Sequence, residues 1–152
     1  MSNLCELPRK NASSNEISEI LSRYKTVAIV GISDKEDRDS YIVGKYLIEN
    51  GYTVIPVNPN ITEFMGIKAY PSLLEIPGTV DVVDIFRKPE AVPEIVEHAI
   101  KKGAKVIWMQ KGIVNNAAAE NARAHGLKVV MDRCMMVEHR ARKATGNNSN
   151  SP

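Results

Sequence analysis

Residue types that build disulfides, metal sites and membrane spans are scarce in this sequence. Among its 152 residues are two cysteines, Cys5 and Cys134, and three histidines. Two cysteines near opposite ends form no disulfide framework, and no metal-ligand spacing appears among the cysteines and histidines. No apolar run approaches the roughly 20 residues of a membrane span, and the N-terminus lacks the apolar core of a signal peptide. We therefore expect a cytoplasmic protein with no metal and no membrane partner.

A strong charge of either sign is also lacking. Lys and Arg together number 20 and Asp and Glu 18, which gives a formal net charge of +2. This balance argues against a nucleic-acid partner. The one dense basic run, Arg140–Lys143, is interpreted as a solvated helix end.

Five short apolar runs alternate with amphipathic helical patterns along the chain. This alternation predicts an α/β fold with a Rossmann-like, three-layer, doubly wound parallel sheet of five strands in the order 3-2-1-4-5. Residues 13–144 would form this domain, residues 1–12 a flexible arm and residues 145–152 a disordered tail. Residues 60–79 are expected to form an irregular connection with one helical turn. The expected strands, in chain order, are Thr26–Val30, Thr53–Val57, Val80–Phe86, Lys105–Met109 and Lys128–Met131.

Local signals place the helices between these strands. Ser13 and Glu16 have the spacing of a capping box, and the apolar positions that follow share one helical face. Pro89 and Pro93 suit the first turn of a helix that Gly103 would end. Further helices are expected from about Ser40 to Glu49, from Asn116 to His125 and over Met135–Arg142.

Ligands of doubly wound sheets bind beyond the carboxyl ends of the strands. For this chain, that rule selects five segments: Gly31–Arg38, Asn58–Pro59, Phe86–Pro89, Gln110–Gly112 and Asp132–Cys134.

The first of these segments does not match the fingerprint of nicotinamide dinucleotides. That fingerprint needs three spaced glycines after the first strand and an acidic residue after the second. Here Gly31 stands alone, Ser33 occupies the place of the second glycine, and Asn58 ends the second strand. We therefore expect neither NAD nor, without a cation directly after Asn58, NADP.

Five motifs together resemble a known family. They are VAIVGISDKEDRDSY, GYTVIPVNP, VDIFRKPE, IWMQKGI and DRCMMVEH, which span Val27 to His139. In this order they resemble the small stand-alone CoA-binding proteins, which are similar to the CoA-binding domain of the succinyl-CoA synthetase α subunit and of NDP-forming acyl-CoA synthetases.

The resemblance implies coenzyme A as the cofactor. Backbone N–H groups from Gly31 to Ser33 would meet the pyrophosphate together with Arg38, and Lys35 or Arg87 would lie near the 3′-phosphate. Asn58 would border the adenosine, and the Gln110–Gly112 turn would offer N–H groups to the pantetheine amides. The implied site comprises Gly31, Ile32, Ser33, Lys35, Arg38, Tyr41, Asn58, Pro59, Phe86, Arg87, Lys88, Gln110 and Gly112.

Ordinary structural roles remain open for several of these residues. Lys35 and Arg38 stand among acidic neighbours and could be paired surface charges, while Arg87 and Lys88 could be solvated. Trp108, inside a strand, is interpreted as a core residue.

Cys134 and two carboxylates also carry alternatives. Cys134 is either an inert buried thiol or a contact of the cofactor thiol, with which it would form a mixed disulfide. Asp81 and Asp84, three residues apart on a strand, point to opposite faces and cannot act as a catalytic pair. Glu138 and His139 are interpreted as a helix-end pair.

The sequence therefore predicts a protein that binds CoA or an acyl-CoA without catalysis of its own. The alternatives are a partner-dependent component of an acyl-CoA ligase and a CoA or redox sensor. The resemblance implies that ligase chemistry uses a phosphorylated histidine and a nucleotide-binding unit in further domains, for which this chain offers no room. No protein partner can be inferred.

Overall fold

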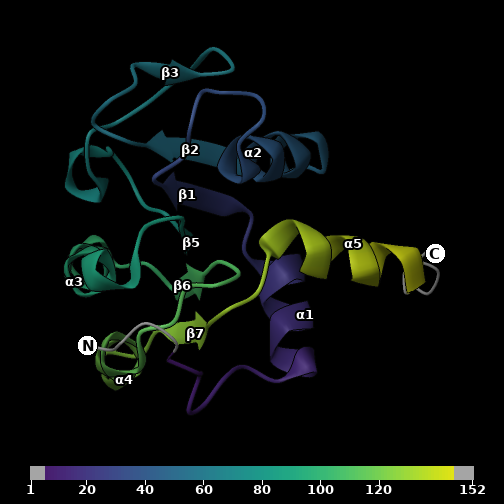
Figure 1. Cartoon of the computed structure of the whole chain (residues 1–152), viewed down its shortest axis with the longest axis vertical. Helices are drawn as coiled ribbons and strands as arrows, with labels where there is room; N and C mark the ends of the chain where they lie inside the picture. The colour runs from purple at the N-terminus through teal and green to yellow at the C-terminus, as the bar shows by residue number, and fades with distance from the viewer. Residues whose placement is uncertain (1–5, 146–152) are drawn as a thin grey trace.

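The computed structural model describes residues 6–145 (Figure 1), so that Cys5 and residues 146–152 of the predicted tail lie outside it. The α-helices are α1 (Ser14–Arg23), α2 (Asp39–Glu49), α3 (Val92–Lys102), α4 (Asn116–Ala124) and α5 (Met135–Thr145). The strands are β1 (Thr26–Val30), β2 (Thr53–Val57), β3 (Glu63–Phe64), β4 (Ile67–Lys68), β5 (Val82–Ile85), β6 (Val106–Met109) and β7 (Lys128–Val130). Two short 3₁₀ helices are η1 (Leu73–Glu75) and η2 (Pro89–Ala91).

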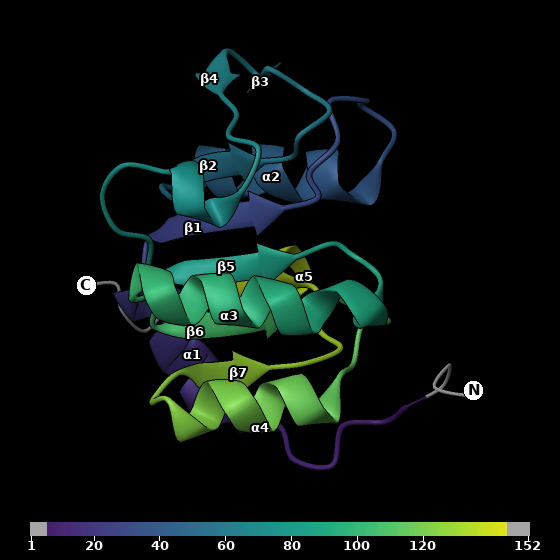
Figure 2. The same ribbon diagram turned by 90° about the vertical axis from the view of Figure 1, so that its left-hand side faces the viewer.

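Five parallel strands form the main sheet in the order β2-β1-β5-β6-β7 (Figure 2). The predicted α/β, doubly wound architecture is confirmed. The expected third strand, however, lies as β5 beside β1 and not at the sheet edge. The position beside β2 is filled by an isolated parallel bridge between Val57 and Tyr70. Counted with this bridge as the third strand, the order follows the 3-2-1-4-5 pattern.

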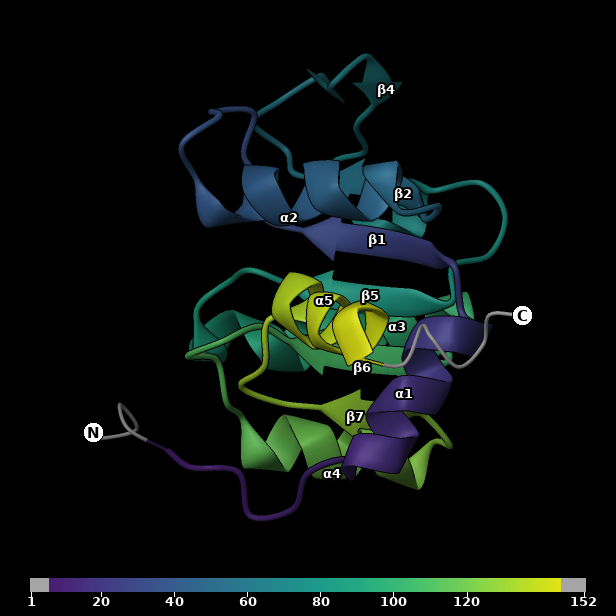
Figure 3. The same cartoon turned by 90° about the vertical axis from the view of Figure 1, so that its right-hand side faces the viewer.

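Helices cover both faces of the sheet, as two views from opposite sides show (Figures 2 and 3). α3 and α4 lie on one face, and their residues Val96 and Ala119 join Val83 and Ile107 of the sheet in one buried cluster. α1, α2 and α5 cover the other face, where Ile20 and Leu47 pack with Ile29 and Trp108. Strands buried on both sides explain the continuous apolar runs of the sequence.

The helix signals are confirmed at their capping residues. The Ser13 hydroxyl accepts from the Glu16 N–H at 3.1 Å, and the Glu16 carboxylate accepts from the Ser13 N–H at 2.8 Å. α3 begins after Pro89 and ends at Gly103, which has the left-handed φ of 78°. The connection of residues 60–79 contains the expected helical turn, η1, but also the β3–β4 hairpin, which was not predicted.

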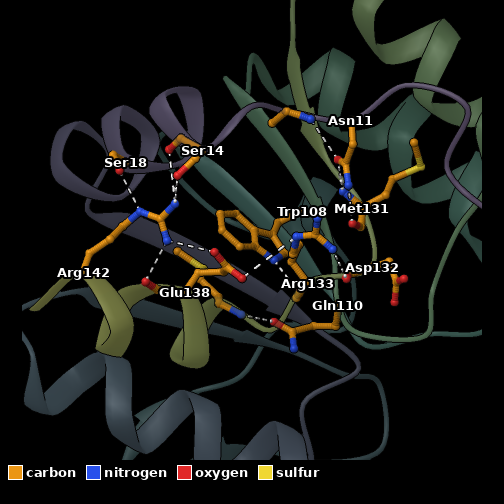
Figure 4. Close-up of polar contacts among 12 residues, drawn as sticks. Asn11, Ser14, Ser18, Trp108, Gln110, Met131, Asp132, Arg133, Glu138 and Arg142 are labelled. Atoms are coloured by element: carbon orange, nitrogen blue, oxygen red, sulfur yellow. Dashed lines mark hydrogen bonds and ion pairs between the residues drawn. The ribbon is translucent and has the colours of Figure 1, made fainter. Parts of the chain in front are cut away.

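The described part of the predicted arm is held against the domain by hydrogen bonds. The Asn11 amide pairs with the backbone of Met131 in both directions, at 2.8 and 2.9 Å (Figure 4). Asn116, which is buried, accepts from the Arg9 N–H and donates to the Leu7 carbonyl. These bonds join the start of the chain to α4 and β7.

Arg142 joins α5 to α1 (Figure 4), so within the basic run that was interpreted as a solvated helix end this one side chain is instead engaged in hydrogen bonds. Its guanidinium donates to the hydroxyls of Ser18 and Ser14 at 2.7 and 3.1 Å and to the Glu138 carboxylate at 2.8 Å. Glu138 thus pairs with Arg142, while Nδ1 of His139 lies 2.8 Å from the Tyr46 hydroxyl.

Among the described residues no helix combines the length and apolarity needed to cross a membrane.

Candidate functional site

Gly31 ends β1 at the centre of the carboxyl edge of the sheet. Its φ is 93°, and a Cβ at this position would lie 2.7 Å from the Phe86 carbonyl oxygen and 2.9 Å from Cδ of Arg87. Glycine is therefore required by conformation and by space. The close approach brings the loops after β1 and β5 together.

The backbone N–H groups predicted to bind phosphate are largely used within the protein. The Gly31 N–H donates to the Val57 carbonyl at 2.8 Å, and the Ser33 N–H donates to the Ser40 hydroxyl at 2.9 Å. The Ser33 hydroxyl accepts from the Lys35 N–H at 3.0 Å. The Ile32 side chain is fully buried. Of the three N–H groups predicted to bind phosphate, those of Gly31 and Ser33 are therefore engaged, and that of Ile32 has no partner among residues 6–145.

Lys35, Arg38 and Tyr41 do not line the two strand-end cavities described below. Lys35 and Arg38 are exposed, and neither forms an ion pair within residues 6–145. Arg38 precedes α2 and its carbonyl accepts from the N–H groups of Tyr41 and Ile42. The Tyr41 ring packs edge-on against Phe64, with centroids 5.0 Å apart.

A polar cavity of about 480 Å³ lies beyond the ends of β1 and β2, and we call it the Asn58 cavity. Amides, a hydroxyl, an imidazole and a guanidinium line it, together with apolar side chains. Its lining includes Gly31, Asn58, Pro59, Asn60, Ser72, Leu73, Arg87, Glu94 and His98.

The Asn58 side chain holds the wall of this cavity in place. Its Nδ2 donates to the Ile32 carbonyl at 2.8 Å, and its Oδ1 accepts from the Asn60 N–H at 2.8 Å. Both ends of the amide are therefore engaged, and Asn58 borders the cavity as a structural residue.

A second cavity, of about 550 Å³, lies beyond β5 and β6 between α2 and α5, and we call it the Cys134 cavity. Most of its wall is apolar, and three cations stand around it. Its lining comprises Asp39, Ile42, Val43, Phe86, Arg87, Lys88, Gln110, Lys111, Ile113, Cys134 and Met136. Arg87 lines both cavities, so they adjoin at the loop that packs against Gly31.

Three hydrogen bonds fix the loop that carries Cys134, and those made by Trp108 and Gln110 can be followed in Figure 4. The Trp108 indole donates to the Arg133 carbonyl at 2.8 Å, which confirms that this tryptophan is a core residue. The Asp132 carboxylate accepts from the Gly112 N–H at 2.7 Å, and Gln110 Oε1 accepts from the Met135 N–H at 3.1 Å.

These bonds also change the predicted role of the Gln110–Gly112 turn. The N–H groups of Gln110 and Gly112 are used by Ile85 and Asp132. The Gln110 side chain is only 4% exposed, yet its Nε2 has no partner within residues 6–145. This turn therefore presents a side-chain donor to the cavity.

Asp84 is the one fully buried carboxylate that we find without a hydrogen-bond partner in the described part of the chain. It lies on β5 between Ile29 and Trp108 of the neighbouring strands. Burial raises the pKa of this carboxyl well above its usual value. No group of His, Cys, Asp and Glu suited to a metal ion occurs among residues 6–145.

The structure thus brings together eight of the residues predicted for the ligand site and its thiol contact: Gly31, Asn58, Pro59, Phe86, Arg87, Lys88, Gln110 and Cys134. Ile32, Ser33, Lys35, Arg38, Tyr41 and Gly112 are not in the walls of these two cavities. Sequence reasoning missed Ile42, Lys111 and Met136 beside Cys134, and Ser72 and His98 beside Asn58. Lys111 lies inside the predicted segment Gln110–Gly112, Met136 lies two residues after Cys134, and Ile42 lies four residues after Arg38. This closeness to the predicted strand ends was the only available signal.

The chain is similar to proteins of known sequence and structure. Residues 25–140 match the family model described as "CoA binding domain". The chain is 44% identical to the uncharacterized protein YneT of Bacillus subtilis (strain 168) over 88% of its own length and 99% of that protein. It is 33% identical to the ADP-forming acetate–CoA ligase I subunit alpha of Pyrococcus furiosus, over 74% of this chain but only 28% of the subunit.

A solved structure of a hypothetical protein from Pyrococcus horikoshii OT3 shares the fold. It is 49% identical, with a TM-score of 0.84, and the match covers 93% of this chain and 98% of that protein.

Proposed function

Because this chain belongs to the family of CoA-binding domains, we propose that it binds coenzyme A, or an acyl-CoA, across the two adjoining cavities. The observation that carries the proposal is their pairing at Arg87, with polar groups in the Asn58 cavity and an apolar wall in the Cys134 cavity. Each volume lies in the range of about 300–1,000 Å³ that is typical of ligand sites.

The two cavities suit the two ends of the cofactor. CoA joins a phosphorylated adenosine to a long pantetheine arm that ends in a thiol. The amides and the hydroxyl of the Asn58 cavity suit the adenosine, and the apolar wall around Phe86 suits the arm. Arg87, between them, is placed to bind phosphate through paired guanidinium donors.

Gln110 has a specific part in this proposal. Gln110 lines the Cys134 cavity, and its Nε2 forms no hydrogen bond among residues 6–145, so this N–H is available to an acceptor in the cavity. The pantetheine arm carries two amide carbonyls, and Gln110 Nε2 would donate to one of them. We propose that the chain binds the cofactor without catalysing a reaction of its own.

Titration calorimetry under reducing conditions tests the proposal. We expect CoA to bind with one site per chain and NAD not to bind. Arg87→Ala should weaken CoA binding by about tenfold or more, the effect of losing a charge-assisted hydrogen bond. Lys128→Ala, which removes an exposed cation at the start of β7, should leave the affinity unchanged. Equal affinities for all three proteins, or no heat with CoA, would refute the assignment.

A further inference from the structure

Cys134 lies where the apolar cavity meets the start of α5. It is partly exposed and lines the cavity beside Gln110, Phe86 and Met136. Its carbonyl accepts from the Glu138 N–H at 2.9 Å, which places it directly before the first turn of the helix. The thiol is therefore accessible from the cavity.

The position of this thiol is fixed from both sides. The residue before it, Arg133, accepts through its carbonyl from the Trp108 indole, and the residue after it, Met135, donates to Gln110. Both partners lie in or directly after β6, a rigid strand of the sheet. Cys134 is thus held more firmly than a residue of an ordinary surface loop.

Gln110 lines the same cavity as the thiol and offers a side-chain donor to a ligand there. The side chain is 96% buried, since only 4% is exposed, and its Oε1 is engaged by Met135. Its Nε2 is left to face the cavity, where an amide carbonyl of an entering arm would satisfy it. Cys134 lines the same cavity, so an arm bound there has the thiol on its wall.

We propose that Cys134 forms a mixed disulfide with the thiol of CoA by exchange with a CoA disulfide. The proposal rests on the proposed function, since the adenosine must be held in the Asn58 cavity for the arm to reach Cys134. The chain would then hold CoA covalently under oxidising conditions and reversibly under reducing ones.

The exchange balances without a further oxidant. Cys134 loses its proton to solvent, and its sulfur attacks one sulfur of the disulfide. A bond forms between Cys134 Sγ and that sulfur as the original S–S bond breaks. The other half leaves as a thiolate and takes up a proton, so one disulfide is replaced by another.

Intact-mass spectrometry after incubation with CoA disulfide tests the proposal. We expect one CoA adduct per chain, removed by a reducing thiol. Cys5→Ser should keep the adduct and Cys134→Ser should lose it. Glutathione disulfide has no adenosine to hold it and should react at least about tenfold more slowly, because binding raises the effective concentration of the CoA disulfide. Saturating acetyl-CoA, which fills the cavity without a free thiol, should slow the reaction.

Binding of CoA under reducing conditions separates the two proposals. If wild type and Cys134→Ser both bind CoA but the wild type forms no adduct, the mixed disulfide is refuted and the binding function stands. An adduct that persists in Cys134→Ser, or that forms equally fast with glutathione disulfide, also refutes it. If neither protein binds CoA, the proposed function itself fails.

Discussion

The carbonyl oxygen of Phe86 lies 2.7 Å from the point that a Cβ at Gly31 would occupy. These residues directly follow β5 and β1, which are neighbouring strands of the sheet. Their contact sets the separation of the two loops and places Arg87 between the cavities. Gly31 thus shapes the site through packing, while its own N–H is used by Val57.

Gly31→Ala should therefore destabilise the fold. The left-handed φ costs an alanine about 1–2 kcal/mol, and displacing the Phe86 carbonyl should add about 1–3 kcal/mol. Gly51→Ala is the matched control, because its φ is 92° but no atom lies within 4 Å of the added Cβ. Urea unfolding measures both losses. Equal losses in the two variants would contradict the clash at Gly31.

Asp84 should lower stability increasingly as the pH rises. Because burial raises its folded-state pKa, the folded chain keeps the proton that the unfolded chain releases near the ordinary pKa. Stability is thus lost between the ordinary and the raised value. Asp84→Val should raise the free energy of unfolding at pH 7 by about 1–3 kcal/mol and flatten its decline with pH.

Denaturant unfolding at several pH values checks this expectation. Asp81→Asn, at a partly exposed carboxylate just before β5, should leave the pH dependence as in the wild type. A valine variant less stable than the wild type at neutral pH would show that the carboxyl has a stabilising partner.

Arg142→Met should loosen α5 from α1. The Arg142 side chain is 25% exposed and its guanidinium bridges Ser14, Ser18 and Glu138, so its loss should cost about 1–2 kcal/mol. Arg142→Lys should restore little, since an ammonium cannot bridge the same acceptors. Arg140→Met, at an exposed position of the same helix, is the control in thermal unfolding. If both methionine variants lost equal stability, the bridge would be energetically unimportant.

The architecture was predictable because it depends on local signals. Continuous apolar runs marked the buried strands, and Ser13, Pro89 and Gly103 marked helix ends through capping and backbone conformation. The order of the strands was less accessible, because the place of β5 depends on packing across the sheet. The β3–β4 hairpin was missed because strands of two residues have no periodicity.

The site was predictable as a set of strand ends but not as a set of contacts. Gly31, Arg87 and Gln110 follow from the rule that ligands bind at the carboxyl edge. That Asp132 and Ser40 occupy the N–H groups of Gly112 and Ser33 depends on hydrogen bonds between distant loops. The sequence contains no local sign of such bonds.

The central claim is that one CoA molecule spans the two cavities, and a crystal structure grown with CoA and NAD together tests it most directly. We expect density for CoA alone, with the adenosine against Asn58, a phosphate at Arg87 and the thiol end beside Cys134. NAD in these cavities, or CoA bound elsewhere on the surface, would contradict the account.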